Sequence, residues 1–247
     1  MPIMNAANFR AALVRGDAVH GIWRTLPGDA MTEIIAHGGY DFQIFDQEHG
    51  ALGWAEVQTM VRLNNALKRM SFVRLGDKSP IAAQRALDTG AHGLVYPQVD
   101  SEADISLLAE NLAFAPHGRR GFNPFVPGFG YGAQRSVAIG LPLLIPIVES
   151  KAGLKALPSI CAHPAVDVVY LGAYDLSVQL GTPGDVKSAV VMEALKSAVE
   201  ICQAHQCPIG LMVGSSAACQ SWAAAGVQIF LHGVDGGILN EAFTRKT

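Results

Sequence analysis

The sequence has little charge and no cluster of basic residues. Only 16% of its 247 residues are charged, and no run of Lys and Arg is longer than a pair such as Arg119–Arg120. With a formal net charge of −3, the chain has no basic segment that would indicate nucleic-acid binding. A hydrophobic fraction of 50% and a mean hydropathy of +0.25 exclude intrinsic disorder, and they favour an oligomer that covers apolar surface.

The sequence also lacks a long hydrophobic run and a secretion signal. Its longest apolar run, Ala138–Val148, is shorter than the roughly 20 residues of a transmembrane helix and contains two prolines. Met1–Asp17 has no continuous apolar core, so it does not resemble a signal peptide. We therefore expect a cytoplasmic protein with no membrane partner.

The 4 cysteines form neither a CxxC pair nor a disulfide framework. They are Cys161, Cys202, Cys207 and Cys219. We expect reduced thiols in a cytosolic enzyme, most of them buried. A chain of this length buries enough surface to fold without a disulfide or a structural metal.

Short apolar runs alternate with amphipathic segments along nearly the whole chain, a pattern typical of repeated strand–helix units. The expected strands are His20–Thr25, Asp41–Phe45, Ser71–Leu75, Gly93–Tyr96, Leu143–Val148, Val166–Leu171, Ile209–Val213 and Gln228–Leu231. The expected helices between them are Ala30–His37, Trp54–Ala66, Pro80–Thr89, Ser101–Ala113, Ala152–Cys161, Val190–His205 and Ser216–Ala225.

These units predict one α/β domain over residues 1–247, a (β/α)₈ TIM barrel. Strands such as Val166–Leu171 are apolar on both faces, as buried parallel strands are, and no GxGxxG motif follows the first strand as a doubly wound sheet would require. The last helix, Gly237 to Lys246, is short for closing a barrel. Gly118–Gly132 is rich in Gly, Pro and aromatic residues, which predicts a lid or binding loop.

Two carboxylates follow neighbouring strands of this barrel, at the end where functional residues of such barrels lie. Glu149 follows the fifth strand and Asp175 the sixth. Because adjacent strands lie about 5 Å apart, both side chains could bind one hard divalent cation such as Mg²⁺ or Mn²⁺. A salt bridge for Glu149 and a turn cap for Asp175 are the competing interpretations.

His49 and Arg74 complete a candidate site. His49 follows the second strand among acidic residues, which suits a general base, although a structural histidine is the competing interpretation. Arg74 ends the third strand and can bind a carboxylate or phosphate, or pair with Asp46, Glu48 or Glu149. A metal, a base and an arginine together favour enolisation of a carboxylated carbonyl compound. The remaining histidines are expected at helix ends or turns in structural roles (His20, His92, His163, His205) or are undecided (His117, His232).

At these residues the chain resembles the HpcH/HpaI aldolase family, the metal-dependent class II pyruvate aldolases. The resemblance covers residues 18 to 240, and the EHG, RRG and GxxDLS elements together are specific. The matching segments are GIW (21–23), DFQIFDQEHG (41–50), FVRL (72–75), ALDTGAHGLVYPQV (86–99), PHGRRG (116–121), IVE (147–149) and LGAYDLSVQLG (171–181).

The resemblance implies a phosphoenolpyruvate/pyruvate-type barrel and a role for each matching residue. Glu149 and Asp175 match metal ligands for Mg²⁺, Mn²⁺ or Co²⁺. His49 matches the catalytic base, with Asp46 near it for orientation. Arg74 matches the residue that contacts the carboxylate or keto oxygen of the substrate.

The resemblance also implies substrate contacts and an assembly. Backbone amides at Ala173, Tyr174 and Asp175 would hold the pyruvate carboxylate, and Trp23 would line the pocket. Asp88 matches a residue supplied by a neighbouring subunit, in a homohexamer built as a trimer of dimers that exchange their last helices. The chain departs from the family at Ile147, where Gln is usual, at the bulky Tyr174 and in its more aromatic lid.

We therefore expect a lyase that reversibly cleaves a 4-hydroxy-2-oxo acid into pyruvate, or a close 2-oxo acid, and an aldehyde through a metal-stabilised enolate. No lysine ends the sixth strand, where a Schiff-base barrel aldolase commonly has one. A lyase for citramalyl- or malyl-type CoA esters would need a basic groove that the sequence lacks. A phosphate-binding isomerase or epimerase using Gly233–Gly237, and a non-catalytic binding protein, are two further hypotheses.

Overall fold

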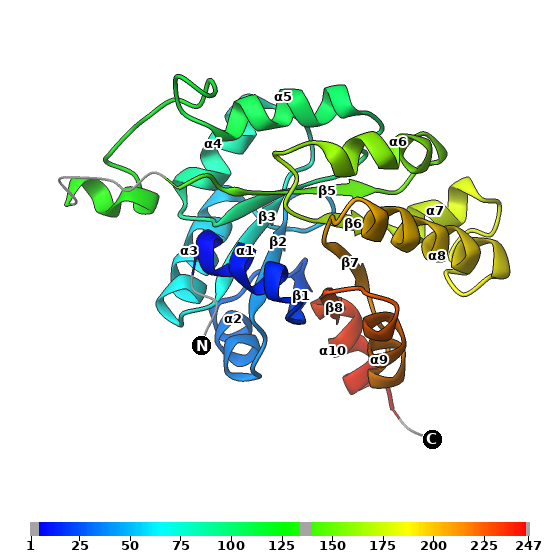
Figure 1. Ribbon diagram of the computed structural model, residues 1–247. Coiled ribbons are helices and arrows are strands. Elements are labelled where there is room, and N and C mark those ends of the chain that lie inside the picture. The colour runs from blue at the N-terminus through cyan, green and yellow to red at the C-terminus, as the bar shows by residue number, and fades with distance from the viewer. Residues whose placement is uncertain (1–4, 134–139, 246–247) are drawn as a thin grey trace.

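In the computed structural model, which describes residues 5–133 and 140–245, eight parallel strands form a closed barrel with helices on its outside (Figure 1). The strands are β1 (Val19–Arg24), β2 (Phe42–Asp46), β3 (Met70–Arg74), β4 (Gly93–Tyr96), β5 (Leu143–Val148), β6 (Val169–Leu171), β7 (Ile209–Met212) and β8 (Ile229–Val234). The helices are α1 (Ala6–Arg15), α2 (Asp29–His37), α3 (Trp54–Ala66), α4 (Pro80–Asp88), α5 (Glu102–Leu112), α6 (Lys151–Ala162), α7 (Ala173–Gln179), α8 (Ala189–Ala204), α9 (Ser216–Ala224) and α10 (Asp235–Phe243). No helix within these two ranges has the length and apolarity needed to cross a membrane.

The strands pair in chain order, and β1 pairs with β8 to close the barrel, which confirms the predicted fold. Two predicted strands, Gly93–Tyr96 and Leu143–Val148, have the observed bounds, and the bounds of the others differ by one to three residues. The largest differences, three residues each, are at the start of β6, which begins at Val169 rather than Val166, and at the end of β8, which ends at Val234 rather than Leu231. Asp167 lies two residues before β6. Its carboxylate forms an ion pair with Arg10 at 2.6 Å and accepts a hydrogen bond from the amide of Leu144 at 2.9 Å.

Helix α1 was not expected from the sequence. It begins after Asn5, whose side chain accepts a bond from the amide of Asn8, and it ends at Gly16 in the left-handed region. Its Phe9 is fully buried and meets Phe72 edge-on with ring centroids 5.5 Å apart. Arg10 donates to the carbonyls of residues 141 and 142, which precede β5, so α1 covers the N-terminal end of the barrel.

Alternate residues of each strand point into the barrel or outward to the helices, and this alternation gives the core two layers. Phe42 and Ile44 of β2 pack inside the barrel with Phe72, whereas Phe45 packs outside with Val73 and the helices. On β1, Trp23 belongs to the inner layer, so the flanking Ile22 and Arg24 face outward.

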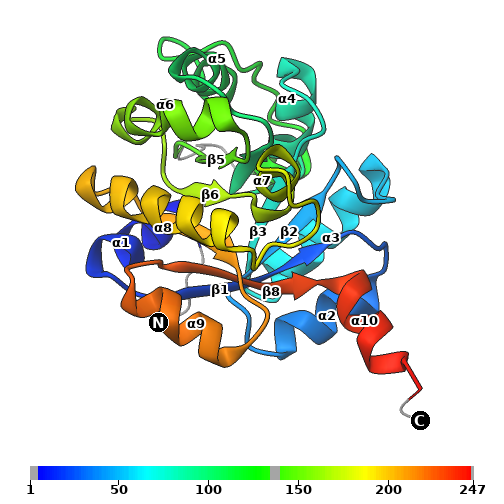
Figure 2. The same ribbon diagram turned by 90° about the vertical axis from the view of Figure 1, so that its right-hand side faces the viewer.

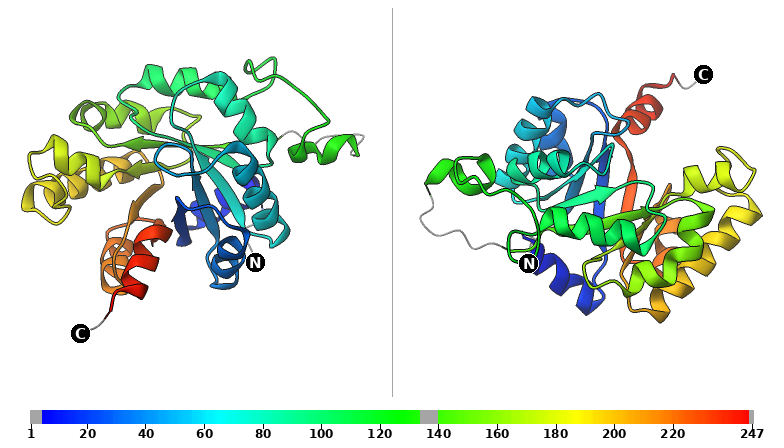
Figure 3. Two further views of the ribbon diagram at one scale, coloured as in Figure 1. Left: turned by 180° about the vertical axis from the view of Figure 1, so that it is seen from behind. Right: turned by 90° about the horizontal axis from the view of Figure 1, so that it is seen from above.

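The segment Gly118–Gly132 does not line the cavity of its own chain, so the prediction of a lid over that cavity was wrong, whereas a binding loop stays a prediction. Arg120 pairs with Asp88 at 3.0 Å and packs on the ring of Phe114 at 4.6 Å, and Gly128 lies against the C-terminal end of α4. Because α4 runs away from the strand ends that carry the candidate site, these contacts hold the segment at the opposite end. A short 3₁₀ segment, Pro127–Gly132, projects from the side of the barrel (Figure 3).

Helix α10 projects from the barrel instead of covering it (Figures 1 and 2). It begins two residues before the predicted start, and its predicted end at Lys246 lies outside the described residues. Ile238 and Phe243 are exposed on it, the latter to 81%. The helix therefore carries apolar surface that its own barrel does not bury.

Candidate functional site

A cavity of about 700 Å³ opens at the C-terminal ends of the strands and brings the predicted site residues together. Every predicted residue except Asp88 lines it, namely Trp23, Asp46, His49, Arg74, Glu149, Ala173, Tyr174 and Asp175. This is the end of a (β/α)₈ barrel at which functional residues are found. Asp88 lies at the far end of α4, where it pairs with Arg120.

The two predicted metal ligands lie on neighbouring elements of this cavity. Glu149 follows β5, is 7% exposed, and accepts a hydrogen bond of 2.7 Å from the amide of Gln98. Asp175 lies in the first turn of α7, the short helix after β6 that the sequence did not reveal. Burial raises the pKa of Glu149 to about 7, and the negative charges of Asp175 and Glu48 act in the same direction. A hard divalent cation would relieve this repulsion, so the donor set fits such an ion.

Gly172 lets the Glu149 carboxyl group take this position. A Cβ atom at residue 172 would lie 2.6 Å from both Cβ and Oε2 of Glu149 and 3.1 Å from Cγ2 of Ile147. Gly172→Ala is therefore expected to displace the carboxylate, lowering catalytic efficiency roughly 10- to 100-fold and destabilising the fold by about 1–3 kcal/mol.

The control for this substitution is Gly237→Ala in α10, where a Cβ atom would meet nothing within 4 Å. Gly237→Ala should be neutral or slightly stabilising because alanine favours a helix. Urea unfolding and steady-state kinetics measure both variants. Equal stability and equal catalytic efficiency of the two variants would contradict the packing role of Gly172.

The raised pKa of Glu149 also predicts how stability depends on pH in metal-free protein. As pH rises from 4.5, the ordinary value, towards 7, the unfolded chain loses this proton before the folded chain does, so stability falls. One pKa unit corresponds to about 1.36 kcal/mol, so the loss is roughly 3 kcal/mol and is complete above pH 7.

Urea unfolding of chelator-treated protein between pH 4.5 and 8 measures this loss. Glu149→Gln should flatten most of the decline, and the remainder should come from Glu48, whose pKa burial also raises. Parallel profiles for the native chain and Glu149→Gln would rule out Glu149 as the source.

Asp46 and Arg74 form a buried ion pair beside the carboxylates. Arg74 Nε donates to Asp46 Oδ1 at 2.9 Å, its Nη2 bonds Oδ2, and its Nη1 lies 2.9 Å from Glu48 Oε2. The amides of Glu48 and His49 also donate to Asp46. Burial alone would raise the pKa of Asp46, but Arg74 and these amides outweigh it and hold the pKa below its usual value. The predicted pairing of Arg74 is therefore present, and its side chain lines the cavity as well.

His49 stands at the mouth of the cavity with its side chain 68% exposed. Its Nε2 lies 3.9 Å from Oε1 of Glu48. Asp46 lies near His49 as predicted, but it accepts a bond from the backbone amide of His49 and not from the ring. Asp46 shapes the loop that carries His49, and Glu48 is the carboxylate beside the ring.

Three largely apolar side chains form an inner wall of the cavity. The Trp23 ring lies 5.4 Å from that of Tyr170 and 4.7 Å from the Arg74 guanidinium, and its Nε1 donates to Asp46 at 3.1 Å. Ile147 pairs in register with Tyr170 and is buried. Tyr170 was not predicted, although its place just before the end of the sixth predicted strand could have indicated it.

A buried network that the sequence did not reveal joins the end of β1 to the start of α10. The fully buried Arg24 donates to Asp235 at 2.9 Å and to Gln43 at 2.8 Å. Asp235 also accepts bonds from the amides of Thr25 and Gly236. A phosphate at Gly233–Gly237 would therefore face a carboxylate and an amide that is already bonded, which disfavours the isomerase or epimerase hypothesis.

The family to which this arrangement belongs follows from comparison with known proteins. The HpcH/HpaI aldolase/citrate lyase family model matches residues 20–242. The chain belongs to this family. A hydroxypyruvate/pyruvate aldolase of Paraburkholderia phytofirmans is 33% identical over 196 residues, which cover 75% of each chain. The chain is therefore an enzyme of the aldolase and lyase class.

Solved structures agree with this membership. An HpcH/HpaI aldolase/citrate lyase family protein from Burkholderia cenocepacia superposes with a TM-score of 0.89 at 27% identity, covering 95% of each chain. The citrate synthase SbnG superposes with a TM-score of 0.84 at 27% identity, covering 95% of this chain and 94% of its own.

Proposed function

We propose that this family member reversibly cleaves a 4-hydroxy-2-oxo acid into pyruvate, or a close 2-oxo acid, and an aldehyde, with a divalent metal ion as cofactor. The observation that carries this proposal is the placement of Glu149 and Asp175 in one cavity with Arg74 and His49. The hydroxypyruvate/pyruvate aldolase relative supports the choice of a 2-oxo acid.

Each residue has a role that follows from its position. A divalent cation held by Glu149 and Asp175 would polarise the 2-oxo group and stabilise the negative charge that develops on its oxygen during cleavage. Arg74, fixed by Asp46, would donate to the substrate carboxylate or keto oxygen. Residues 173–175 line the cavity in the first turn of α7, and their amides would bind the carboxylate.

His49 would move the proton in the same reaction. In cleavage, it would take the proton from the C4 hydroxyl as the C3–C4 bond breaks, and in synthesis it would return the proton to the new alkoxide. Its exposed position at the mouth suits this role, because a substrate whose 2-oxo acid half binds at Glu149 and Asp175 would extend its aldehyde half towards the mouth.

The charge of the cavity argues against a CoA ester as the substrate. Among the described lining residues the Lys and Arg side chains are Arg74 and Lys187, and Arg74 is already paired with carboxylates. The acidic lining residues are Asp46, Glu149, Asp175 and Glu241. An acidic lining attracts a divalent cation and repels the phosphates of CoA.

Pyruvate consumption measured against a panel of aldehydes, with Mg²⁺, Mn²⁺ or Co²⁺ returned to chelator-treated enzyme, tests the proposed function. We expect no turnover without metal and turnover with at least one of the three ions. Activity that survives thorough chelation would exclude the metal mechanism. Turnover of a malyl- or citramalyl-type CoA ester instead would establish the CoA-ester lyase.

The exposed apolar side chains of α10 predict that the chain forms an oligomer. We propose a homohexamer, a trimer of dimers whose subunits exchange their last helices. In it, a neighbouring subunit would bring Asp88 to the cavity mouth. Because Ile238 and Phe243 are exposed on α10, replacing both with Asp should convert the assembly into smaller species without unfolding the barrel. Light scattering after gel filtration measures the mass against the 26.1 kDa chain. A native chain that is monomeric at micromolar concentration would contradict the assembly.

A further inference from the structure

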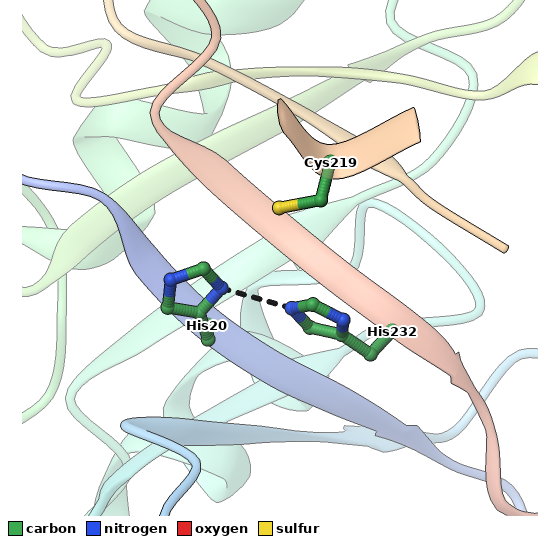
Figure 4. A group of neighbouring side chains, drawn as sticks. All are labelled: His20, Cys219 and His232. Atoms are coloured by element: carbon green, nitrogen blue, oxygen red, sulfur yellow. Dashed lines mark hydrogen bonds between the residues drawn. The ribbon is translucent and has the colours of Figure 1, made fainter. Parts of the chain in front are cut away.

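Two histidines and a cysteine meet where the outer face of the barrel packs against α9, and one of them, His232, also lines the cavity. His20 lies on β1, His232 on β8 and Cys219 on α9 (Figure 4). One potential ligand atom from each lies within 4.8 Å of those of the two neighbours. His20 Nδ1 and His232 Nε2 are 2.9 Å apart, and Figure 4 shows the Cys219 side chain above this pair. All three side chains are partly buried.

The alternation of the strands explains why these side chains meet. Val19 of β1 belongs to the inner layer, so the next residue, His20, faces outward. There its ring stacks on that of Phe230, with the ring centroids 5.6 Å apart. His232 follows the inward-facing Leu231 and also points outward. His20 is part of β1, as the predicted strand His20–Thr25 has it, and does not sit at a helix end or turn.

The spacing of the ligand atoms is close to that of a coordinated ion. Two nitrogens bound to one tetrahedral Zn²⁺ at about 2.0–2.1 Å from the metal are roughly 3.4 Å apart. The histidine nitrogens therefore need to separate by only about 0.5 Å, and the thiol sulfur is within reach of the same ion. Burial and the neighbouring His20 lower the pKa of His232, which favours the neutral imidazole that a metal requires.

We propose that His20, Cys219 and His232 bind one borderline-soft transition-metal ion of the Zn²⁺ class, with an open fourth position. Imidazole and thiolate ligands select Zn²⁺ and Co²⁺ over Mg²⁺. The carboxylate pair of the cavity has the opposite preference, since oxygen ligands suit hard cations. The chain thus carries two sites of different ligand chemistry. Because the thiol of Cys219 has its pKa raised by burial, binding releases a proton.

A metal ion bound at this site would link α9 to β1 and β8. No residue of α9 is fully buried, and the helix packs against the core through the partly buried Ala218, Cys219 and Trp222. An ion bound at Cys219 would tie the helix to both strands and raise the stability of the folded chain by mass action. Saturation at about 100 times the dissociation constant should raise Tm by roughly 5–10 °C.

Co²⁺ titration of metal-free protein in the presence of excess Mg²⁺ tests the site. Mg²⁺ keeps the carboxylate pair occupied, and a thiolate-to-cobalt absorption band reports only on cysteine ligation. We expect one equivalent of Co²⁺ to produce this band and Zn²⁺ to abolish it by displacement. Cys219→Ala and His232→Asn should each remove the band and the Zn²⁺-dependent rise in Tm.

Two variants serve as controls. Glu149→Gln removes the proposed ligand of the cavity site, and His37→Asn removes an exposed histidine at the end of α2, so both should keep the band. If His232→Asn fails to fold, Cys219→Ala decides, because alanine suits a partly exposed helix position. No cobalt band in the native chain, or a band that persists in Cys219→Ala, would overturn the site without touching the proposed aldolase function.

Discussion

Glu149→Gln is expected to lower kcat/KM for aldol cleavage by at least about 10³-fold while the barrel stays folded. The amide keeps the size of the carboxyl group but loses the charge that a divalent cation requires. A metal ion supplies several kcal/mol of charge stabilisation in such reactions, and each step of about 1.36 kcal/mol is a factor of ten in rate. Because Glu149 is buried beside other carboxylates, removing its charge should leave stability equal or higher. Pyruvate release at increasing metal concentration measures the effect.

Asp175→Asn should show the same loss, because its carboxylate completes the pair. Glu241→Gln is the matched control, since Glu241 lines the outer part of the cavity and is exposed on α10. We expect it to retain nearly full activity. Near-native turnover of Glu149→Gln at saturating metal would show that the buried carboxylate does not hold the cofactor.

The barrel could be predicted from the sequence because its strands carry their own signal. Segments such as Leu143–Val148 are apolar on both faces, and a helix-period segment follows nearly every one. Helix α7 has seven residues and is too short to show the hydrophobic period of a helix in the sequence. Helix α1 carried readable end signals in Asn5 and Gly16, but its role at the bottom of the barrel depends on the contact between Phe9 and Phe72.

The error over residues 118–132 has a specific physical cause. Gly, Pro and aromatic content predicts an irregular segment, and the segment is irregular, but composition does not say which surface it covers. That surface is set by the ion pair between Arg120 and Asp88 and by the packing of Phe114, Phe122 and Phe129. These partners come from different elements, so their meeting cannot be read from the local sequence.

The candidate site was more predictable than the loops because strand ends of a barrel converge. The rule that polar residues at those ends share one cavity predicted that Glu149, Asp175, Arg74 and His49 lie together, and they do. The same rule could not rank partners within the site. It did not show that Arg74 binds Asp46 and Glu48 at once, since Asp46 ends β2 and Glu48 follows it by two residues, and either could have paired alone.

His49→Ala is expected to lower kcat for aldol cleavage by about 10²- to 10⁴-fold with no change in Tm. Loss of a positioned general base has this magnitude. His232 also lines the cavity, but it lies on β8 with its Nε2 2.9 Å from His20 Nδ1. Because the side chain of His49 is 68% exposed and the residue bonds to Asp46 only through its backbone amide, the alanine variant keeps the loop contact. Steady-state kinetics and thermal unfolding of the same preparation separate the two effects.

The exposure of His49 also makes its role testable by chemical rescue. Imidazole added to His49→Ala can reach the vacated position at the mouth and should restore part of kcat, whereas it should not restore Glu149→Gln. His37→Ala, at an exposed histidine outside the cavity, should lose no activity. Full activity of His49→Ala without imidazole would assign proton transfer to another group, and Glu48, 3.9 Å from the ring, would be the next residue to replace.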